Sequence, residues 1–145
     1  MAMASGEEAL ANLLKTGTLK AEPPDQTEFE GLVSAAARLL SDVSVPQLSL
    51  DGRFLLAYDA AHSFALAALR RKGYRSTNRY IVFQALEHTL SIPANKWRLL
   101  AKCHDNRNLA LYEGGFSADQ QLLDELILIA RELQMAVAHL RVRDA

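Results

Sequence analysis

Polar side chains occur where an apolar helix face is expected, in the stretch of residues 97–112. At 3.6 residues per turn, one arc of this predicted helix mixes apolar and polar positions. The apolar members are Trp97, Leu100, Ala101 and Leu111. The polar members are His104, Asp105, Arg107, Asn108 and Tyr112. Burying a guanidinium, an amide and a carboxylate is costly unless each finds a partner, so the pattern indicates a structural polar network, a subunit interface or a functional site.

A second polar set lies on an earlier predicted helix and consists of Tyr58, Asp59 and His62. Asp59 and His62 are about one turn apart, so their side chains can meet on one face of the helix. Asp59 could instead pair with Arg107 across the bundle, which would join the two polar sets. Taken alone, His62 is also compatible with a purely structural place in the core.

Other residue patterns that could indicate catalysis, metal binding or nucleic-acid binding give weaker signals. The four histidines, at positions 62, 88, 104 and 139, do not have zinc-ligand spacing, and the single Cys103 cannot form a thiolate cluster, so we expect no metal and no cofactor. A glycine-rich phosphate loop and a nucleophile elbow are both absent from the sequence. A basic string, interleaved with Tyr74 and Tyr80, is interpreted as a helix cap and a solvated loop, with nucleic-acid contact as the alternative. Its members are Arg70, Arg71, Lys72, Arg75 and Arg79.

Helical periodicity predicts an all-α, up-and-down bundle of four or five helices that positions these residues. A short first helix begins with a capping pattern at Ser5 and Glu8 and ends at Gly17, before a linker with two prolines. Ser117 and Gln120 form a similar pattern before the last helix. We expect the long helix to lie at the centre because it is apolar nearly all round, and we expect no strands. The predicted helices of the bundle are 28–42, 49–72, 77–90, 94–113 and 117–141.

Length and composition predict a single domain over residues 1–145, with a short helix and linker in 1–24 and the bundle in 25–145. The formal net charge of −1 provides no global attraction to nucleic acid, so any RNA contact must be local. The longest near-apolar stretch, 54–69, is too short to span a membrane. A single cysteine and an N-terminus without a signal-peptide pattern predict a cytoplasmic protein.

Three stretches resemble the small prokaryotic HEPN proteins (higher eukaryote and prokaryote nucleotide-binding domain). They are residues 13–20, residues 57–75 and the segment Asn-Arg-Asn-Leu-Ala-Leu-Tyr-Glu-Gly at 106–114. The resemblance implies a helical bundle that forms a homodimer in which the arginine motifs of two subunits face each other. It also implies a link to toxin–antitoxin or defence systems, and a nucleotidyltransferase-type protein as a partner.

Many members of that family are metal-independent ribonucleases that use an arginine, a polar residue and a histidine four to six positions after the arginine. Arg107 and Asn108 match the first two, but Tyr112 stands where the histidine is expected. Tyrosine is a poor base near neutral pH because its hydroxyl has an ordinary pKa of about 10. We therefore expect a binding and interaction module, for RNA, a nucleotide or a protein partner, that lacks the standard ribonuclease activity.

Two alternatives stay open. In the first, the protein is a metal-independent ribonuclease in which Arg107 stabilises the phosphate, Asn108 positions it, and His104 or Tyr112 transfers protons. In the second, Asp59, Arg107 and Asn108 serve only structural pairing between helices. The candidate binding or interface residues are Tyr58, Asp59, His62 and Asp105.

Overall fold

The computed structural model describes residues 6–114 and 118–143 and is almost entirely helical. This confirms the predicted all-α class. In chain order the elements are α1 (Gly6–Lys15), β1 (Lys20–Ala21), α2 (Gln26–Asp42), α3 (Leu50–Arg71), β2 (Tyr74–Arg75), α4 (Arg79–Gln84), α5 (Leu86–Thr89), α6 (Ala94–Asn108), the π-helix η1 (Leu109–Glu113) and α7 (Gln120–Arg143).

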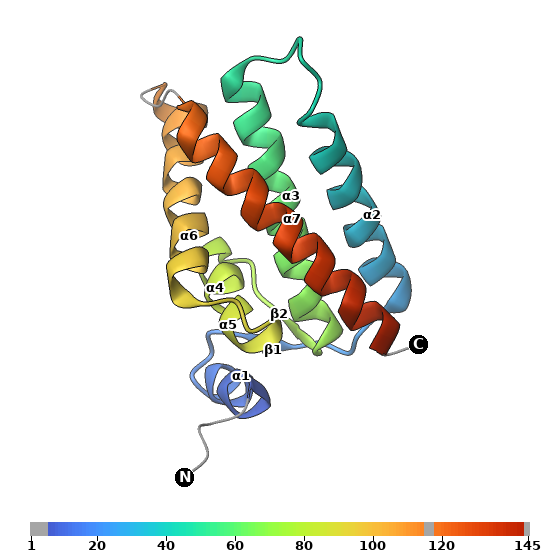
Figure 1. Cartoon of the computed structure of the whole chain (residues 1–145). Coiled ribbons are helices and arrows are strands. Elements are labelled where there is room, and N and C mark those ends of the chain that lie inside the picture. The colour runs from blue at the N-terminus through green and yellow to red at the C-terminus, as the bar shows by residue number, and fades with distance from the viewer. Residues whose placement is uncertain (1–5, 115–117, 144–145) are drawn as a thin grey trace.

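Four long helices form the body of the molecule. In Figure 1, α2 and α6 run upward while α3 and α7 run downward, and α1 lies below the bundle. As expected from its apolar sequence, α3 is central and packs against α2, α7, α4, α5 and α6. Its buried residues include Phe54, Phe64 and Leu69, each at 0% exposure. No helix in the described ranges is both long enough and apolar enough to cross a membrane.

Side-chain caps define where the helices begin. The carboxylate of Asp25 accepts from the backbone N–H of Glu28 at 3.0 Å, and the hydroxyl of Ser49 accepts from Gly52 at 3.0 Å. Before α7, the carboxylate of Asp119 accepts from the N–H of Leu122 at 2.8 Å. Each bond satisfies a backbone donor that the first turn of a helix leaves without a partner. The predicted capping residues Ser5 and Ser117 lie outside the described residues.

Three local expectations were wrong. The predicted helix 77–90 is divided into α4 and α5 at Ala85, whose carbonyl accepts from both His88 and Thr89 at 2.9 Å. The predicted helix 94–113 changes to a π-helix after Asn108. A two-residue antiparallel ladder joins β1 to β2. Periodicity does not reveal these features, because a widened turn and a two-residue strand are both shorter than one hydrophobic repeat.

Arg70 is not the solvated helix cap that its basic neighbours suggested. Its side chain is 1% exposed and forms an ion pair with Glu28. Its guanidinium also donates to the carbonyls of Glu22 at 3.0 Å, Pro23 at 2.8 Å and Tyr74 at 3.2 Å. Burial requires such partners for a charged group. Arg70 therefore fastens the linker that precedes α2 to the C-terminal end of α3.

The short helix α1 packs against α5 of the same chain. Leu10 is 2% exposed, and Gly6 lies so close to α5 that a Cβ there would be 2.3 Å from the carbonyl oxygen of His88. Glycine at position 6 therefore permits the close approach of the two helices.

Candidate functional site

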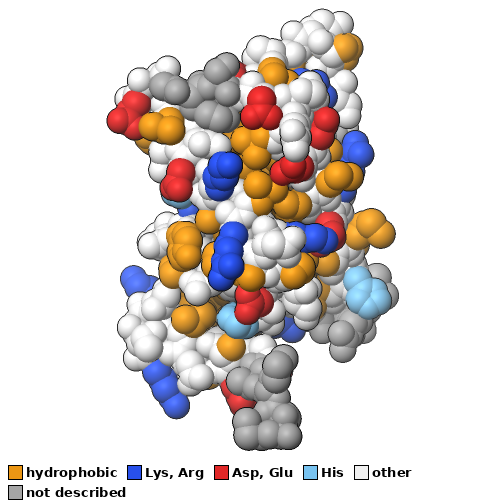
Figure 2. Space-filling model, turned by 60° about the vertical axis from the view of Figure 1, so that its left-hand side comes forward, with side chains coloured by type: hydrophobic (Ala, Val, Ile, Leu, Met, Phe, Trp, Pro, Cys, Tyr) orange, Lys and Arg blue, Asp and Glu red, His pale blue; other side chains and the backbone are white. Residues whose placement is uncertain are grey.

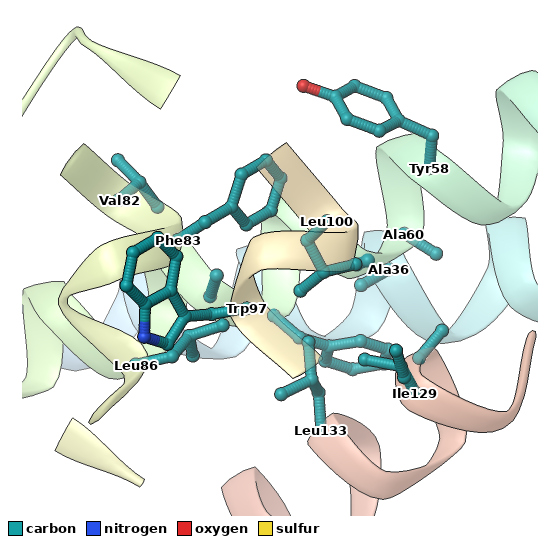
Figure 3. Packing of buried hydrophobic residues seen from close by; sticks show 14 of the residues in the cluster. Ala36, Tyr58, Ala60, Val82, Phe83, Leu86, Trp97, Leu100, Ile129 and Leu133 are labelled. Carbon is teal, nitrogen blue, oxygen red and sulfur yellow. The ribbon is translucent and has the colours of Figure 1, made fainter. Parts of the chain in front are cut away.

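Tyr58 is the centre of a polar cluster that three helices build together. Its side chain, on α3, is 0% exposed. Its hydroxyl lies 2.9 Å from Nδ1 of His104 on α6 and accepts from Nη1 of Arg79 on α4 at 3.3 Å. Figure 3 shows the Tyr58 hydroxyl pointing away from Ile129 and Leu133 of α7, so the cluster lies at the side of the core opposite that helix.

Two arginines lie against the Tyr58 ring. The guanidinium carbons of Arg79 and Arg107 are each 5.6 Å from the ring centroid. This separation allows a favourable cation–π interaction. The side chains of Arg79 and Arg107 are 31% and 19% exposed, so both retain access to solvent.

The carboxylate of Asp59 lies near both arginines. Oδ1 of Asp59 lies 3.8 Å from Nη1 of Arg79 and 3.9 Å from Nε of Arg107. Both distances are longer than a hydrogen bond, so neither guanidinium is held in a tight bidentate pair with Asp59. Two positive charges therefore share one negative charge, and the group of Asp59, Arg79 and Arg107 has an excess of positive charge.

His104 and Asn108 complete the cluster from α6. Nδ2 of Asn108 lies 3.4 Å from Nε2 of His104, one turn earlier on the helix. Burial, and then the positive charge of Arg79, lower the pKa of His104 below its usual value. The imidazole is therefore neutral at pH 7 and has one nitrogen able to accept a proton. We call the set of Tyr58, Asp59, Arg79, His104, Arg107 and Asn108 the Tyr58 cluster.

His62 lies beside this cluster, against the ring of Phe83 on α4. It follows Tyr58 by one turn on α3, and both rings contact the ring of Phe83 edge-on at 5.8 Å. Burial, together with the charge of Arg79, lowers the pKa of His62 to about 4. His62 is therefore a neutral, mainly structural neighbour at pH 7 rather than a second positive charge.

The structure separates two predicted site residues from the others. Tyr112 is 77% exposed, and among the described residues no hydrogen bond joins it to the Tyr58 cluster. It lies on η1, whose wider turn moves it away from the arc expected for a regular α-helix. Asp105 is exposed on α6. Of the two partners considered for Asp59, Arg107 lies near it, in a long ion pair at 3.9 Å.

Sequence reasoning missed the place of Arg79 in this cluster, because Arg79 was grouped with Arg75 in a basic string interpreted as a cap and a solvated loop, with nucleic-acid contact as the alternative. It is instead the first residue of α4, and the side chain of Asn78 caps that helix by accepting from Ile81 at 3.2 Å. An asparagine followed by a helical pattern is a recognisable start signal. The predicted helix 77–90 already contained Arg79, but no pattern in the sequence places its side chain against Tyr58.

Among the described residues, the structure indicates neither a metal-binding site nor a reactive thiol. No three His, Cys, Asp or Glu side chains are grouped there in a way that could hold a metal ion. Cys103 is buried, and burial raises the pKa of its thiol to about 12, which makes it a poor nucleophile.

Compared with known proteins, the chain matches no family model, no curated protein and no solved structure.

Proposed function

We propose that this protein is a HEPN-like binding module whose Tyr58 cluster holds a phosphate group of RNA or of a nucleotide. One observation carries the proposal: two arginines lie against one tyrosine ring and share a single carboxylate at 3.8 and 3.9 Å. A phosphodiester brings the negative charge that this arrangement lacks. Phosphate oxygens also accept the charge-assisted hydrogen bonds that guanidinium groups donate.

A site that binds only one or two phosphates is consistent with the net charge of the whole chain. With a formal net charge of −1, the protein has no general attraction for polyanions. Affinity for a phosphate must then come from a few converging donors, and Arg79, Arg107 and Asn108 provide them from two helices. We expect contact with one or two phosphates rather than an extended nucleic-acid track.

The resemblance to HEPN proteins supports the same proposal at Arg107 and Asn108. Tyr112 in place of the family's histidine favours binding over the standard cleavage reaction. The resemblance also leads us to propose a homodimer in which the two clusters face each other, and a nucleotidyltransferase-type protein as partner. A role in toxin–antitoxin or defence systems follows from the same resemblance.

A metal-independent ribonuclease is the second candidate, and the position of His104 favours it. A neutral His104 could accept the proton of a ribose 2′-hydroxyl while the 2′-oxygen forms a bond to phosphorus and the bond from phosphorus to the 5′-oxygen breaks. The proton would then pass to the 5′-oxygen, which leaves a 2′,3′-cyclic phosphate and a 5′-hydroxyl. Arg107 would stabilise the extra negative charge on the pentacovalent phosphate.

A binding and cleavage assay tests both candidates. Fluorescence anisotropy with labelled single-stranded RNA, without divalent metal, is measured for wild type, Arg79→Ala, Arg107→Ala and Arg38→Ala. Arg38 is exposed on α2, so its variant makes the same change in net charge away from the cluster. We expect weaker binding in the first two variants only. Equal affinity in all four proteins would refute the proposal.

Gel analysis of the same samples separates binding from cleavage. Intact RNA with wild-type protein supports the binding module. Cleavage that disappears in both Arg107→Ala and His104→Gln would establish the ribonuclease instead. Cleavage that persists in both variants would come from a contaminating nuclease.

A further inference from the structure

Tyr80 presents an exposed aromatic ring on α4, directly after Arg79 of the Tyr58 cluster. Its side chain is 47% exposed, and its ring meets the ring of Trp97 on α6 edge-on, with centroids 5.8 Å apart and 89° between the ring planes. In this geometry Trp97 covers at most one face of the Tyr80 ring. Because nearly half of the side chain is exposed, a face of the ring is open to a flat ligand.

Trp97 gives the Tyr80 ring a rigid support. It is 5% exposed, and its indole N–H donates to Oε1 of Glu87 on α5 at 2.8 Å. A buried tryptophan whose N–H has a fixed acceptor keeps one orientation. The position of Tyr80 is therefore largely fixed before a ligand binds, so stacking on its ring costs little conformational entropy.

Arg98 brings a positive charge to the same place. It is exposed on α6, and its guanidinium carbon lies 5.5 Å from the centroid of the Trp97 ring. Figure 2, which brings the α6 side of the molecule forward, shows Lys and Arg side chains next to hydrophobic ones on this face. Proteins bind single-stranded nucleic acid with such combinations, because an aromatic ring stacks on a base while a cation contacts the backbone. We call Tyr80, Trp97 and Arg98 the Tyr80 platform.

The Tyr80 platform and the Tyr58 cluster lie along the same pair of helices. Arg79 and Tyr80 are consecutive residues of α4, and α4 packs against α6. On α6, Trp97 and His104 are seven residues apart, so they lie on the same side of the helix, about 10 Å from each other along its axis. One strand of nucleic acid can therefore place a phosphate in the cluster and a neighbouring base on Tyr80.

We propose that Tyr80 stacks on an unpaired nucleobase of a single-stranded RNA whose phosphate lies in the Tyr58 cluster, and that Arg98 contacts the next phosphate. This inference rests on the proposed function and narrows its ligand to a single strand. A duplex does not fit, because its bases are paired and stacked on one another and leave no face for Tyr80. Every base has a face that can stack, so we expect little preference among sequences.

Removal of the bases tests the stacking contact directly. Fluorescence anisotropy measures the affinity of wild type and Tyr80→Ala for a short labelled oligoadenylate and for an abasic strand of the same length. We expect Tyr80→Ala to bind oligoadenylate at least about fivefold more weakly than wild type does. The two proteins should bind the abasic strand equally, because it has no base to stack. Tyr80→Phe keeps the ring and should bind oligoadenylate as wild type does.

Further samples separate this contact from other causes. Met135→Ala removes an exposed apolar side chain from α7, which contributes no residue to the cluster or the platform, and should keep the wild-type affinity. Arg98→Gln should weaken the binding of both strands, since it removes a contact with the backbone. Wild type should bind adenosine monophosphate, and the duplex of oligoadenylate with oligouridylate, at least about fivefold more weakly than oligoadenylate.

The fluorescence of Trp97 gives a second measurement, which needs no variant. Trp97 is the single tryptophan of the chain and contacts Tyr80, so its emission reports on the Tyr80 platform. We expect saturating oligoadenylate to change the emission of wild-type protein, and the saturating abasic strand to leave it unchanged. Equal changes with both strands would contradict a stacked base.

The outcomes distinguish this inference from the proposed function. If Arg79→Ala and Arg107→Ala lose RNA affinity while Tyr80→Ala retains it, the phosphate site stands and the stacking contact is refuted. Binding of the duplex or of the abasic strand to wild type as tightly as oligoadenylate also refutes the stacking contact. If both arginine variants retain the wild-type affinity, the proposed function fails, and the proposed path of the strand fails with it.

Discussion

The hydroxyl oxygen of Tyr58 lies 2.9 Å from Nδ1 of His104, a residue 46 positions later in the chain. This bond joins the central helix α3 to α6, and the contact of the same hydroxyl with Arg79 adds α4 at 3.3 Å. Tyr58 therefore holds one group that can bind a phosphate, Arg79, and one group that can accept a proton, His104. Because the tyrosine is fully buried, the three helices fix these positions before any ligand arrives.

Tyr58→Phe separates the role of this hydroxyl from the role of the ring. The phenylalanine keeps the aromatic surface under Arg79 and Arg107 but leaves His104 and Arg79 without the hydroxyl partner. We expect a loss of about 1 kcal/mol in the free energy of unfolding, because one buried hydrogen-bonding group is removed. We also expect weaker RNA binding, measured by anisotropy. Unchanged stability together with unchanged binding would mean that the hydroxyl has no positioning role.

The proposed contacts of Arg79 and Arg107 with phosphate predict how RNA affinity depends on salt concentration. If each contacts a phosphate, removing one should reduce the slope of log affinity against log salt by about 0.7 to 1. Arg79→Ala and Arg107→Ala should therefore bind RNA less tightly and with a shallower salt dependence. Arg38→Ala, exposed on α2, should keep the wild-type slope. A wild-type slope in both cluster variants would show that these guanidinium groups do not contact phosphate.

The lowered pKa of His62 predicts how the stability of the protein depends on pH. Its pKa in the folded protein, about 4, lies below the ordinary value of 6.5, so the unfolded chain takes up the proton first as the pH falls. Above pH 6.5 His62 is neutral in both the folded and the unfolded chain, so it does not lower the free energy of unfolding. As the pH falls from 6.5 toward 4, protonation of His62 in the unfolded chain lowers that free energy. His62→Gln should therefore lose less stability than wild type on acidification, by about 2 kcal/mol, allowing for the partial exposure of His62.

Urea unfolding at about pH 7 and about pH 4.5 measures this difference. His139→Gln is the matched control, because it makes the same substitution at a histidine that is exposed on α7. If His62→Gln and wild type lose the same amount of stability between the two pH values, His62 does not have a lowered pKa in the folded protein.

The buried guanidinium of Arg70 leads to a prediction about stability that is independent of the Tyr58 cluster. Arg70→Met keeps much of the side-chain volume but removes a buried guanidinium that bonds to Glu28 and to three backbone carbonyls. We expect the free energy of unfolding to fall by about 3 kcal/mol, since Glu28 and the carbonyls lose a buried partner. Proteolysis should become faster in the linker of residues 18–25. Wild-type resistance and stability would contradict the fastening role of Arg70.

The sequence predicted the helices well because long apolar repeats and capping residues mark them directly. It also placed Tyr58, Asp59, His104, Arg107 and Asn108 among the candidate residues, since polar groups on an apolar face require partners. It did not reveal Arg79, whose contact with Tyr58 depends on how α4 crosses α3. It grouped Tyr112 with the site because a regular 3.6-residue turn was assumed, and the π-helix η1 breaks that assumption.

Arg70 shows a further limit of local patterns. Three consecutive basic residues before a glycine are typical of a helix end, and α3 does end there. Nothing in that pattern distinguishes a solvated cap from a buried guanidinium. The difference comes from Glu22 and Glu28, which lie more than 40 positions earlier and meet Arg70 only in the folded chain. Long-range pairing of this kind is a property of the tertiary structure.

The most direct test of the central proposal is to observe the guanidinium groups during titration with RNA. In ¹⁵N-labelled protein, the Nε–Hε resonances of Arg79, Arg107 and Arg38 are followed by NMR as a short single-stranded RNA is added. The account predicts that the Arg79 and Arg107 signals shift together and saturate at the same RNA concentration, while the Arg38 signal stays in place. Unchanged Arg79 and Arg107 signals at RNA concentrations that saturate binding elsewhere on the protein would contradict a phosphate site at Tyr58.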